Sequence, residues 1–243
     1  MPTTHGVMGV ASATTLFHVC KDLMLRGVWV DFVNTDSADP TLARNLFATT
    51  FLRDTRCDAL LFIDSDISFR PSLAHRLLET GQDVVGTAYP RRQLDLAAFA
   101  RHAAGGTEPA EMLKAASKAY EFTCLEVWRD ARPQSEPAPG FARMAACGMG
   151  ATLIRRAALQ ALLDSGHVQE HAQGVRGVAN RYFGFFDPVA VDGVVLSEDF
   201  SFCYRWTGLL KRDLWVCVDE TVCHTGRFTH AGRYADHMAT PPS

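Results

Sequence analysis

Hydrophobic and polar positions alternate between two kinds of segment along the first ninety residues. Short apolar or β-branched runs, each typical of a strand, occur at Gly6–Ala11, Val28–Val33, Ala59–Ile63 and Asp83–Gly86. Between them, apolar residues recur at helical spacing over Thr14–Arg26, Asp39–Arg53 and Pro71–Thr80. This β-α-β-α-β-α-β alternation predicts an α/β fold with a mostly parallel, doubly wound central sheet flanked by helices.

The pattern after Tyr89 is less regular. Arg129–Gly140 has the proline, serine and charge content of a loop. Ser197 is placed to cap a helix over Glu198–Thr207. The other expected elements are helices at Glu111–Lys118 and Ala157–Asp164, strands at Tyr120–Trp128 and Leu214–Val218, regular structure over Met144–Ile154, and a glycine-rich loop at Ser165–Asp192.

Composition fits one soluble α/β domain with insertions, because 243 residues with 47% hydrophobic content can bury a sizeable core. The net charge of −3 gives no global reason to expect a polyanionic partner. No apolar run approaches the roughly 18 residues that cross a bilayer, and no secretory signal is recognisable. Seven scattered cysteines without a CxxC motif favour reduced thiols and a cytoplasmic location.

Candidate chemistry is concentrated where the Ala59–Ile63 run ends in Asp64-Ser65-Asp66. Two carboxylates one residue apart at the end of a buried strand project into the crevice where open α/β sheets bind ligands. Such like charges are costly unless a cation or ligand hydroxyls lie between them. The motif therefore predicts a divalent-metal site for a phosphorylated ligand, although solvated turn residues would give the same sequence.

The ordered set of motifs resembles nucleotide-sugar glycosyltransferases of the GT-A fold, in particular small bacterial and phage members similar to family 2 and to the Anp1 type. The resemblance spans roughly residues 5 to 228, and any one motif alone is weak. The motifs that carry it are Ala43-Arg44-Asn45, Phe62-Ile63-Asp64-Ser65-Asp66, Gly86-Thr87-Ala88-Tyr89-Pro90-Arg91-Arg92, Gly148-Met149-Gly150-Ala151-Thr152-Leu153-Ile154-Arg155-Arg156, Ser197-Glu198-Asp199-Phe200-Ser201-Phe202-Cys203, and Val218-Asp219 through His224-Thr225-Gly226.

The resemblance implies a single GT-A (Rossmann-like) domain over residues 1–228. Its nucleotide- and metal-binding half would be 1–93 and its acceptor-side half 141–228, with a flexible insertion at 94–140 and a tail at 229–243. In this family the second acid of the motif binds Mn²⁺ or Mg²⁺ on the donor diphosphate. Asp66 would therefore be the principal metal ligand, and Asp64 would contact the ribose or sugar beside the metal.

A late histidine often completes the metal shell in these enzymes, which assigns this role to His224; imidazole suits Mn²⁺ better than Mg²⁺. The alternative is an ordinary hydrogen-bonded loop histidine. Glu198 and Asp199 resemble the acidic pair that opens the acceptor-side helix, with Asp199 as the catalytic base and Glu198 positioning. The alternative is favourable charge at a helix N-terminus, worth ~0.3–1 kcal/mol.

Arg44 and Asn45 resemble nucleotide-side contacts of the family. Arg91 and Arg92 are expected to neutralise phosphate or an acidic acceptor, with solvated loop arginines as the alternative. Gly148 and Gly150 would let the backbone approach the sugar, or would permit only a tight turn. The sequence has neither a GxGxxG fingerprint nor a Walker P-loop, so dinucleotide and ATP binding are not supported.

These inferences together predict a metal-dependent glycosyltransferase that moves a sugar from a nucleoside diphosphate to an acceptor hydroxyl. A glycan, a lipid, a protein or a hydroxylated DNA base all remain open as the acceptor, and a phage enzyme would act in the host cytoplasm. The first alternative is a haloacid-dehalogenase-type phosphatase with Asp64 as nucleophile and Asp66 as acid. The second alternative is a non-catalytic protein that binds sugar nucleotides.

Overall fold

A six-stranded sheet forms the centre of the molecule. The computed structural model describes residues 2–3, 7–37, 39–53, 56–106, 108–118, 120–126, 138–175, 178–226 and 229–238. The strands lie in the order β3 (Ala59–Ile63), β10 (Ala151–Arg155), β5 (Val84–Thr87), β15 (Leu214–Cys217), β9 (Phe141–Cys147) and β8 (Cys124–Glu126).

Most neighbouring strands of this sheet are antiparallel. β10 lies antiparallel between β3 and β5, β9 is antiparallel to β15 and β8 to β9, so that only β5 and β15 pair in parallel. The α/β class is confirmed. The expectation of a mostly parallel sheet is wrong, because β10, from later in the chain, lies antiparallel between β3 and β5. Since β3 and β5 are both antiparallel to β10, they still run in the same direction, and β15 runs with them.

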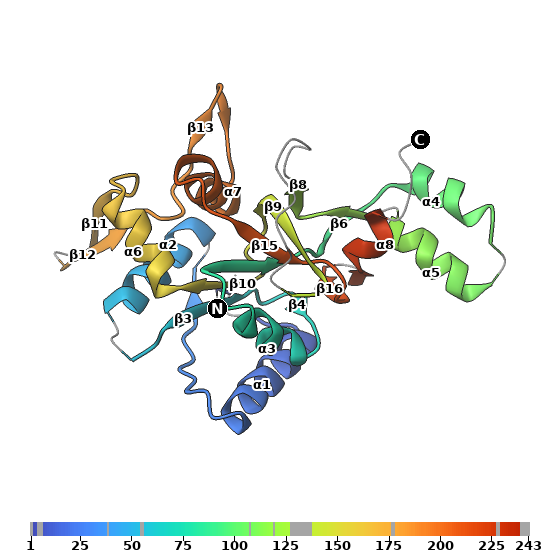
Figure 1. Ribbon diagram of the computed structural model, residues 1–243, viewed down its shortest axis with the longest axis horizontal. Coiled ribbons are helices and arrows are strands. Elements are labelled where there is room, and N and C mark those ends of the chain that lie inside the picture. The colour runs from blue at the N-terminus through green and yellow to red at the C-terminus, as the bar shows by residue number, and fades with distance from the viewer. Residues whose placement is uncertain are drawn as a thin grey trace.

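Helices cover both faces of the sheet (Figure 1). Helices α1 (Val10–Leu25) and α3 (Ser72–Glu79) pack on one face, and α2 (Pro40–Arg53), α6 (Arg156–Asp164) and α7 (Glu198–Cys203) pack on the other. Alternate residues of one strand serve the two cores, as strand geometry requires: Val84 lies in the core with α2 and Val85 in the core with α1. The fold therefore has three layers.

Smaller elements surround this framework. β4 (Ile67–Ser68), β16 (Val222–Thr225) and β17 (Thr229–Gly232) form a three-stranded sheet. A π-helical turn, η1 (Tyr204–Leu209), continues α7. The remaining pairs are β1 (Pro2–Thr3) with β2 (Thr35–Asp36), β6 (Pro90–Leu94) with β7 (Tyr120–Phe122), β11 (Glu170–Val175) with β12 (Val178–Phe183), and β13 (Ala190–Val191) with β14 (Val194–Val195); the remaining helices are α4 (Leu96–Ala103), α5 (Pro109–Lys118) and α8 (Tyr234–Met238).

Three regions differ from the sequence expectation or lie beyond it. The glycine-rich segment 165–192 contains the β11–β12 hairpin, and the insertion contains α4, α5, β7 and β8. Most of the expected loop at 129–140 lies outside the described residues. None of the described helices is both long and apolar enough to cross a membrane.

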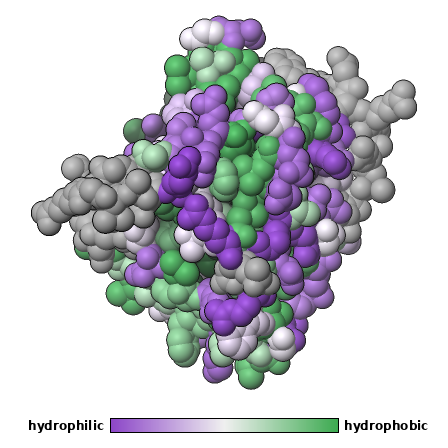
Figure 2. Space-filling view, turned by 90° about the vertical axis from the view of Figure 1, so that its left-hand side faces the viewer, coloured by the Kyte–Doolittle hydropathy of each residue, from purple (hydrophilic) through white to green (hydrophobic). Residues whose placement is uncertain are grey.

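The two expected N-terminal strands are absent from the described residues. Residues 7–9 and 28–34 have no regular secondary structure, and α1 begins at Val10. An apolar cavity of about 480 Å³ lies between the 28–33 segment and β3, and the side chain of Trp29 is exposed. Figure 2 shows apolar surface toward the bottom of the molecule, the end at which α1 lies in Figure 1. A β-branched run thus predicts a strand, but it forms one only where a partner strand accepts its backbone hydrogen bonds.

Two consecutive arginines at the end of β10 hold the C-terminal ends of two helices. Arg155 donates to the carbonyls of Gln82 and Leu78, the latter near the end of α3. Arg156 donates to the carbonyls of Leu52 and Phe51 at the end of α2 at 2.8 and 2.9 Å. Its guanidinium also lies over the Phe51 ring. Because the last carbonyls of a helix lack intrahelical partners and carry partial negative charge, both contacts are favourable.

We therefore expect Arg156→Ala to lower the free energy of unfolding by about 2–3 kcal/mol, measured by urea denaturation. Arg156→Lys should recover little of this loss, since an ammonium cannot reproduce the planar, multidentate donor. The control is Arg53→Ala, which removes an exposed arginine bonded to one carbonyl of Arg181 and should cost under about 0.5 kcal/mol. Equal losses in the two alanine variants would contradict the proposal that Arg156 stabilises the C-terminal end of α2 through its hydrogen bonds.

Candidate active site

A buried arginine lies at the centre of the polar residues that the sequence singles out. The Arg44 side chain comes from α2 and is only 4% exposed. Its two Nη atoms donate to Oδ1 and Oδ2 of Asp64, both at 3.1 Å, which is the bidentate geometry of an arginine–carboxylate pair. Its Nε lies 3.8 Å from Glu198 Oε1, an ion pair too long for a hydrogen bond. Arg44 therefore joins α2, the end of β3 and the start of α7.

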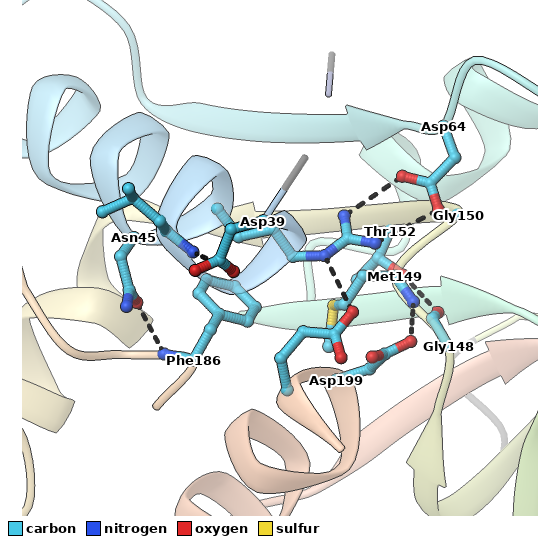
Figure 3. Close-up of polar contacts among 12 residues, drawn as sticks. Asp39, Asn45, Asp64, Gly148, Met149, Gly150, Thr152, Phe186 and Asp199 are labelled. Atoms are coloured by element: carbon cyan, nitrogen blue, oxygen red, sulfur yellow. Dashed lines mark hydrogen bonds and ion pairs between the residues drawn. The ribbon is translucent and has the colours of Figure 1, made fainter. Parts of the chain in front are cut away.

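The N-terminus of α7 adds a third carboxylate, that of Asp199, to this cluster. Asp199 Oδ2 accepts a hydrogen bond from the Met149 backbone N–H at 3.3 Å. Figure 3 shows Asp64 and Asp199 approaching the cluster from different elements, with Gly148, Met149 and Gly150 beside them. Ser197 occupies the N-cap position of α7 as expected, but its side chain makes no capping bond. The charge of the helix terminus is thus met by the acids of its first turn.

Electrostatics distinguishes the members of the cluster. Burial alone would lower the pKa of Arg44, but the Asp64 and Asp199 carboxylates outweigh it and raise the pKa above its usual range. Burial, and then the charge and hydrogen bond of the neighbouring Asp199 carboxylate, raise the pKa of Glu198 to about 7 against the opposing charge of Arg44. Glu198 is therefore partly protonated near neutral pH.

Asp66 faces a different set of partners from Asp64. Its Oδ2 lies 3.3 Å from His224 Nε2 and 3.2 Å from Arg92 Nη1. The antiparallel pairing of β4 with β16 places His224 opposite Ile67 and so brings the two side chains together. Burial alone would raise the pKa of Asp66, but the hydrogen bond and charge of His224, with the charge of Arg92, lower it overall.

The donor set at Asp66 is compatible with a divalent cation bound together with phosphate. His224 Nδ1 lies 2.9 Å from the Pro90 carbonyl and donates to it, so Nε2 is the ring nitrogen that faces Asp66 and would be the one to bind a cation. No group of three or more His, Cys, Asp or Glu side chains suited to a metal meets within the described part of the chain. Two protein ligands suffice where substrate phosphates supply the rest.

The glycines of the 148–150 turn are packed against the ring of Tyr89. A Cβ atom on Gly150 would lie 2.7 Å from Tyr89 Cζ, and one on Gly148 would collide with the Tyr89 hydroxyl. The Gly150 N–H donates to this hydroxyl at 3.0 Å. These glycines were expected to let the backbone approach a sugar. The group that lies against them in the structure is the Tyr89 side chain.

The remaining sequence candidates are divided between structural contacts and solvent. Asn45 donates through Nδ2 to Asp187 Oδ1 and accepts from the Phe186 N–H, both at 2.8 Å. It thereby fixes the segment before α7 to α2, and both ends of its amide are engaged. Arg91 is exposed, as is Arg92 beyond its contact with Asp66.

Sequence reasoning missed two residues of this region. Tyr89 was part of the motif that begins at Gly86 but was given no role, although an aromatic residue directly before Pro90 and two residues after β5 is placed to reach the site. The second is Asp187, whose Oδ2 lies 2.6 Å from His171 Nε2. The spacing of these two residues in the sequence does not indicate this contact. Contacts of this kind depend on tertiary packing alone.

The raised pKa of Glu198 predicts a pH dependence of stability. The folded state binds the Glu198 proton more tightly than the unfolded state, so its contribution is lost as pH rises from about 4.5 through about 7. We expect Glu198→Gln to remove this loss, so that the unfolding free energy of the variant relative to wild type increases by about 2–3 kcal/mol between pH ~5 and pH ~8. Urea denaturation across that range measures the difference.

Glu220→Gln is the matched control, because Glu220 pairs with Arg76 away from this cluster. Its stability relative to wild type should stay within about 0.5 kcal/mol over the range. A Glu198→Gln difference that is flat with pH would contradict the assigned environment of Glu198.

Comparison with known proteins assigns no family to this chain. No protein-family model matches it, and no curated protein sequence matches it. Among solved structures, a similar one is the crystal structure of A197 from STIV, with a TM-score of 0.47 and 14% sequence identity over 93% of this chain and 83% of that chain. This likeness is too weak to carry an argument about activity.

Proposed function

We propose that the protein is a metal-dependent glycosyltransferase that moves a sugar from a nucleoside diphosphate to an acceptor hydroxyl. The observation that carries the proposal is the convergence of two polar groups on one region: the Asp66–His224 pair, and the Arg44 cluster with Asp64 and the acidic pair. Tyr89 contacts both, since its ring lies 5.4 Å from that of His224 and its hydroxyl binds Gly150. The resemblance noted in the sequence supports the same reaction class.

On the donor side, Asp66 and His224 would hold Mn²⁺ or Mg²⁺ together with the two phosphates. Such an ion supplies charge stabilisation to the departing diphosphate. Arg92, which lies against Asp66 and is half-exposed, is free to turn toward a phosphate. Asp64 keeps both oxygens on Arg44, so its contribution is to fix that guanidinium rather than to occupy the metal shell.

On the acceptor side, Asp199 would act as the general base. As the acceptor oxygen bonds to the anomeric carbon and the bond from that carbon to the diphosphate breaks, the hydroxyl proton passes to an Asp199 oxygen. The Met149 N–H donates to Oδ2 of this carboxylate, which leaves Oδ1 as the oxygen that would accept the proton. Glu198, the other acid of the pair, would position Asp199.

A second cavity, of about 610 Å³, lies along α7 and η1, and we propose that it holds part of the acceptor. Phe200 follows Asp199 directly on α7 and lines it, as do Tyr204, Lys211 and Arg212. Aromatic and basic side chains suit an acceptor that has both an apolar and an anionic part. Glycan, lipid, protein and modified DNA acceptors are all compatible with this lining.

The phosphatase alternative has no observation in its favour. A nucleophilic Asp64 would need a free carboxylate oxygen, whereas both oxygens accept hydrogen bonds from the buried Arg44. Steady hydrolysis of p-nitrophenyl phosphate with Mg²⁺, lost in Asp64→Asn, would nevertheless establish it over the transferase.

The donor side is tested by a thermal-shift panel of UDP-, GDP- and CDP-sugars with and without Mn²⁺. We expect one nucleotide to raise the melting temperature by several degrees (~3–6 °C) only when Mn²⁺ is present. Asp66→Asn and His224→Ala should each abolish the manganese-dependent part of the shift, because each removes one of two protein ligands.

The control for the metal ligands is His75→Ala, which removes a histidine paired with Glu79 on α3 and should leave the shift unchanged. A wild-type panel in which Mn²⁺ makes no difference would refute the proposed metal site.

The acceptor side is tested by Asp199→Asn. Its rate of nucleoside diphosphate release from the donor should fall about 10²–10⁴-fold, while affinity for UDP with Mn²⁺ stays within about twofold. Asp236→Asn, which changes an exposed carboxylate paired with Arg233, is the control and should retain activity. If the wild-type protein binds the nucleotide but catalyses neither hydrolysis nor transfer, the non-catalytic alternative holds.

A further inference from the structure

The Tyr89 side chain is fully enclosed between the two polar groups of the site. The residue is 4% exposed, so its phenol cannot be a surface contact for substrate. The edge-on packing of its ring against His224, at an interplanar angle of 82°, places it behind the proposed cation ligands. Its hydroxyl, at the other end, accepts the Gly150 N–H.

The peptide groups around Gly150 connect this hydroxyl to the carboxylates. The Gly150 carbonyl accepts the Asp64 N–H at 3.0 Å, and the preceding peptide N–H, of Met149, donates to Asp199. One short turn therefore binds the Tyr89 hydroxyl, the Asp64 backbone and the Asp199 carboxylate. Displacement of this turn would displace both acids.

The backbone of the same segment holds the other half of the site. The Pro90 carbonyl, next to Tyr89, fixes the His224 ring through Nδ1. The Tyr89 carbonyl accepts both the N–H and the hydroxyl of Thr123, whose own carbonyl accepts the Gly148 N–H at 2.7 Å. The Tyr89–Pro90 segment thus supports the turn through the Tyr89 hydroxyl and Thr123, and it supports His224 through the Tyr89 ring and the Pro90 carbonyl.

We infer that Tyr89 is a positioning residue that sets the separation between the Asp66–His224 pair and the Asp64–Arg44–Asp199 cluster. Its ring supports the histidine and its hydroxyl supports the turn, so the two contacts are separable by substitution. This inference rests on the proposed function for its consequence: a nucleoside diphosphate sugar must reach both groups at once, with phosphate at one and sugar at the other. Positioning errors of this kind are costly in catalysis.

The phenol remains a neutral hydroxyl in this environment. Burial, and then the charges of Asp64 and Asp199, raise the pKa of Tyr89 well above its usual value. A neutral hydroxyl both accepts from Gly150 and retains a proton to donate, whereas a phenylalanine leaves the Gly150 N–H without this partner.

The experiment compares Tyr89→Phe, which removes the hydroxyl and keeps the ring, with Tyr89→Leu, which removes both. Three quantities are measured on the full chain: amide hydrogen exchange by NMR, affinity for Mn²⁺ alone, and release of UDP from the UDP-sugar. For Tyr89→Phe we expect exchange at Gly150 and Met149 to accelerate about tenfold, with Val85 in the sheet unchanged. Its Mn²⁺ affinity should stay within about twofold, and kcat should fall about tenfold with little change in KM.

Tyr89→Leu should show the same local exchange and also weaken Mn²⁺ binding about tenfold, because the His224 ring loses its support. Tyr182→Phe, which removes a hydroxyl from a tyrosine beside His171, is the control and should alter none of the three quantities. Unchanged exchange at Gly150 in Tyr89→Phe, or acceleration spread equally over Val85, would overturn the inference.

Failure of the proposed function is recognised separately. If the wild-type protein binds neither Mn²⁺ nor any of the three nucleotides of the donor panel, the transferase proposal fails, and the exchange rates alone decide whether Tyr89 holds the turn. If the wild-type protein binds and turns over the donor, and both Tyr89 variants do so equally well, the transferase proposal stands and the positioning role of Tyr89 is wrong.

Discussion

The site depends on a single buried cation. Arg44 is almost inaccessible to solvent, and its charge is balanced by Asp64 and Glu198 from two other elements. Removing one partner from such a buried pair leaves an uncompensated charge, which costs more than the intact pair contributes. The helix α2, the end of β3 and the start of α7 are therefore constrained to meet at one point. The buried Nε of Arg44 has no hydrogen-bond partner within the described residues, and the Glu198 carboxylate lies 3.8 Å from it.

The two acids of the Asp64-Ser65-Asp66 motif have divergent roles because of this cation. Asp64 is drawn to Arg44, whereas Asp66 is left to His224 and Arg92 on the other side of the strand end. Like charges one residue apart are thereby neutralised separately, without an ion shared between them. This arrangement explains how the motif is stable in the free protein, and it leaves only Asp66 available to a cation.

Local features of this fold could be predicted from the sequence, and long-range ones could not. The apolar run at β3, the helix beginning at Pro40 with Asp39 accepting the Leu42 N–H, and the acids at the start of α7 follow from local physical chemistry. The position of β10 between β3 and β5 does not, because an apolar strand has the same pattern in either direction. The 28–33 segment shows the same limit, since its β-branched pattern is typical of a strand but the segment has no regular secondary structure.

The candidate site shows a similar division. His224 follows Asp66 by more than 150 residues, and their contact arises only because β16 pairs with β4. Only the resemblance to GT-A enzymes predicted that these two residues would lie together, because no rule based on their spacing in the sequence pairs them. Conversely, Gly148 and Gly150 were singled out for a ligand, and the structure shows a tyrosine ring filling the space that their missing side chains leave. Because the ring also contacts His224, those two glycines are as much a part of the Asp66–His224 side of the site as of the Arg44 side. A change at either glycine would therefore act on both halves at once, through Tyr89, without touching a ligand.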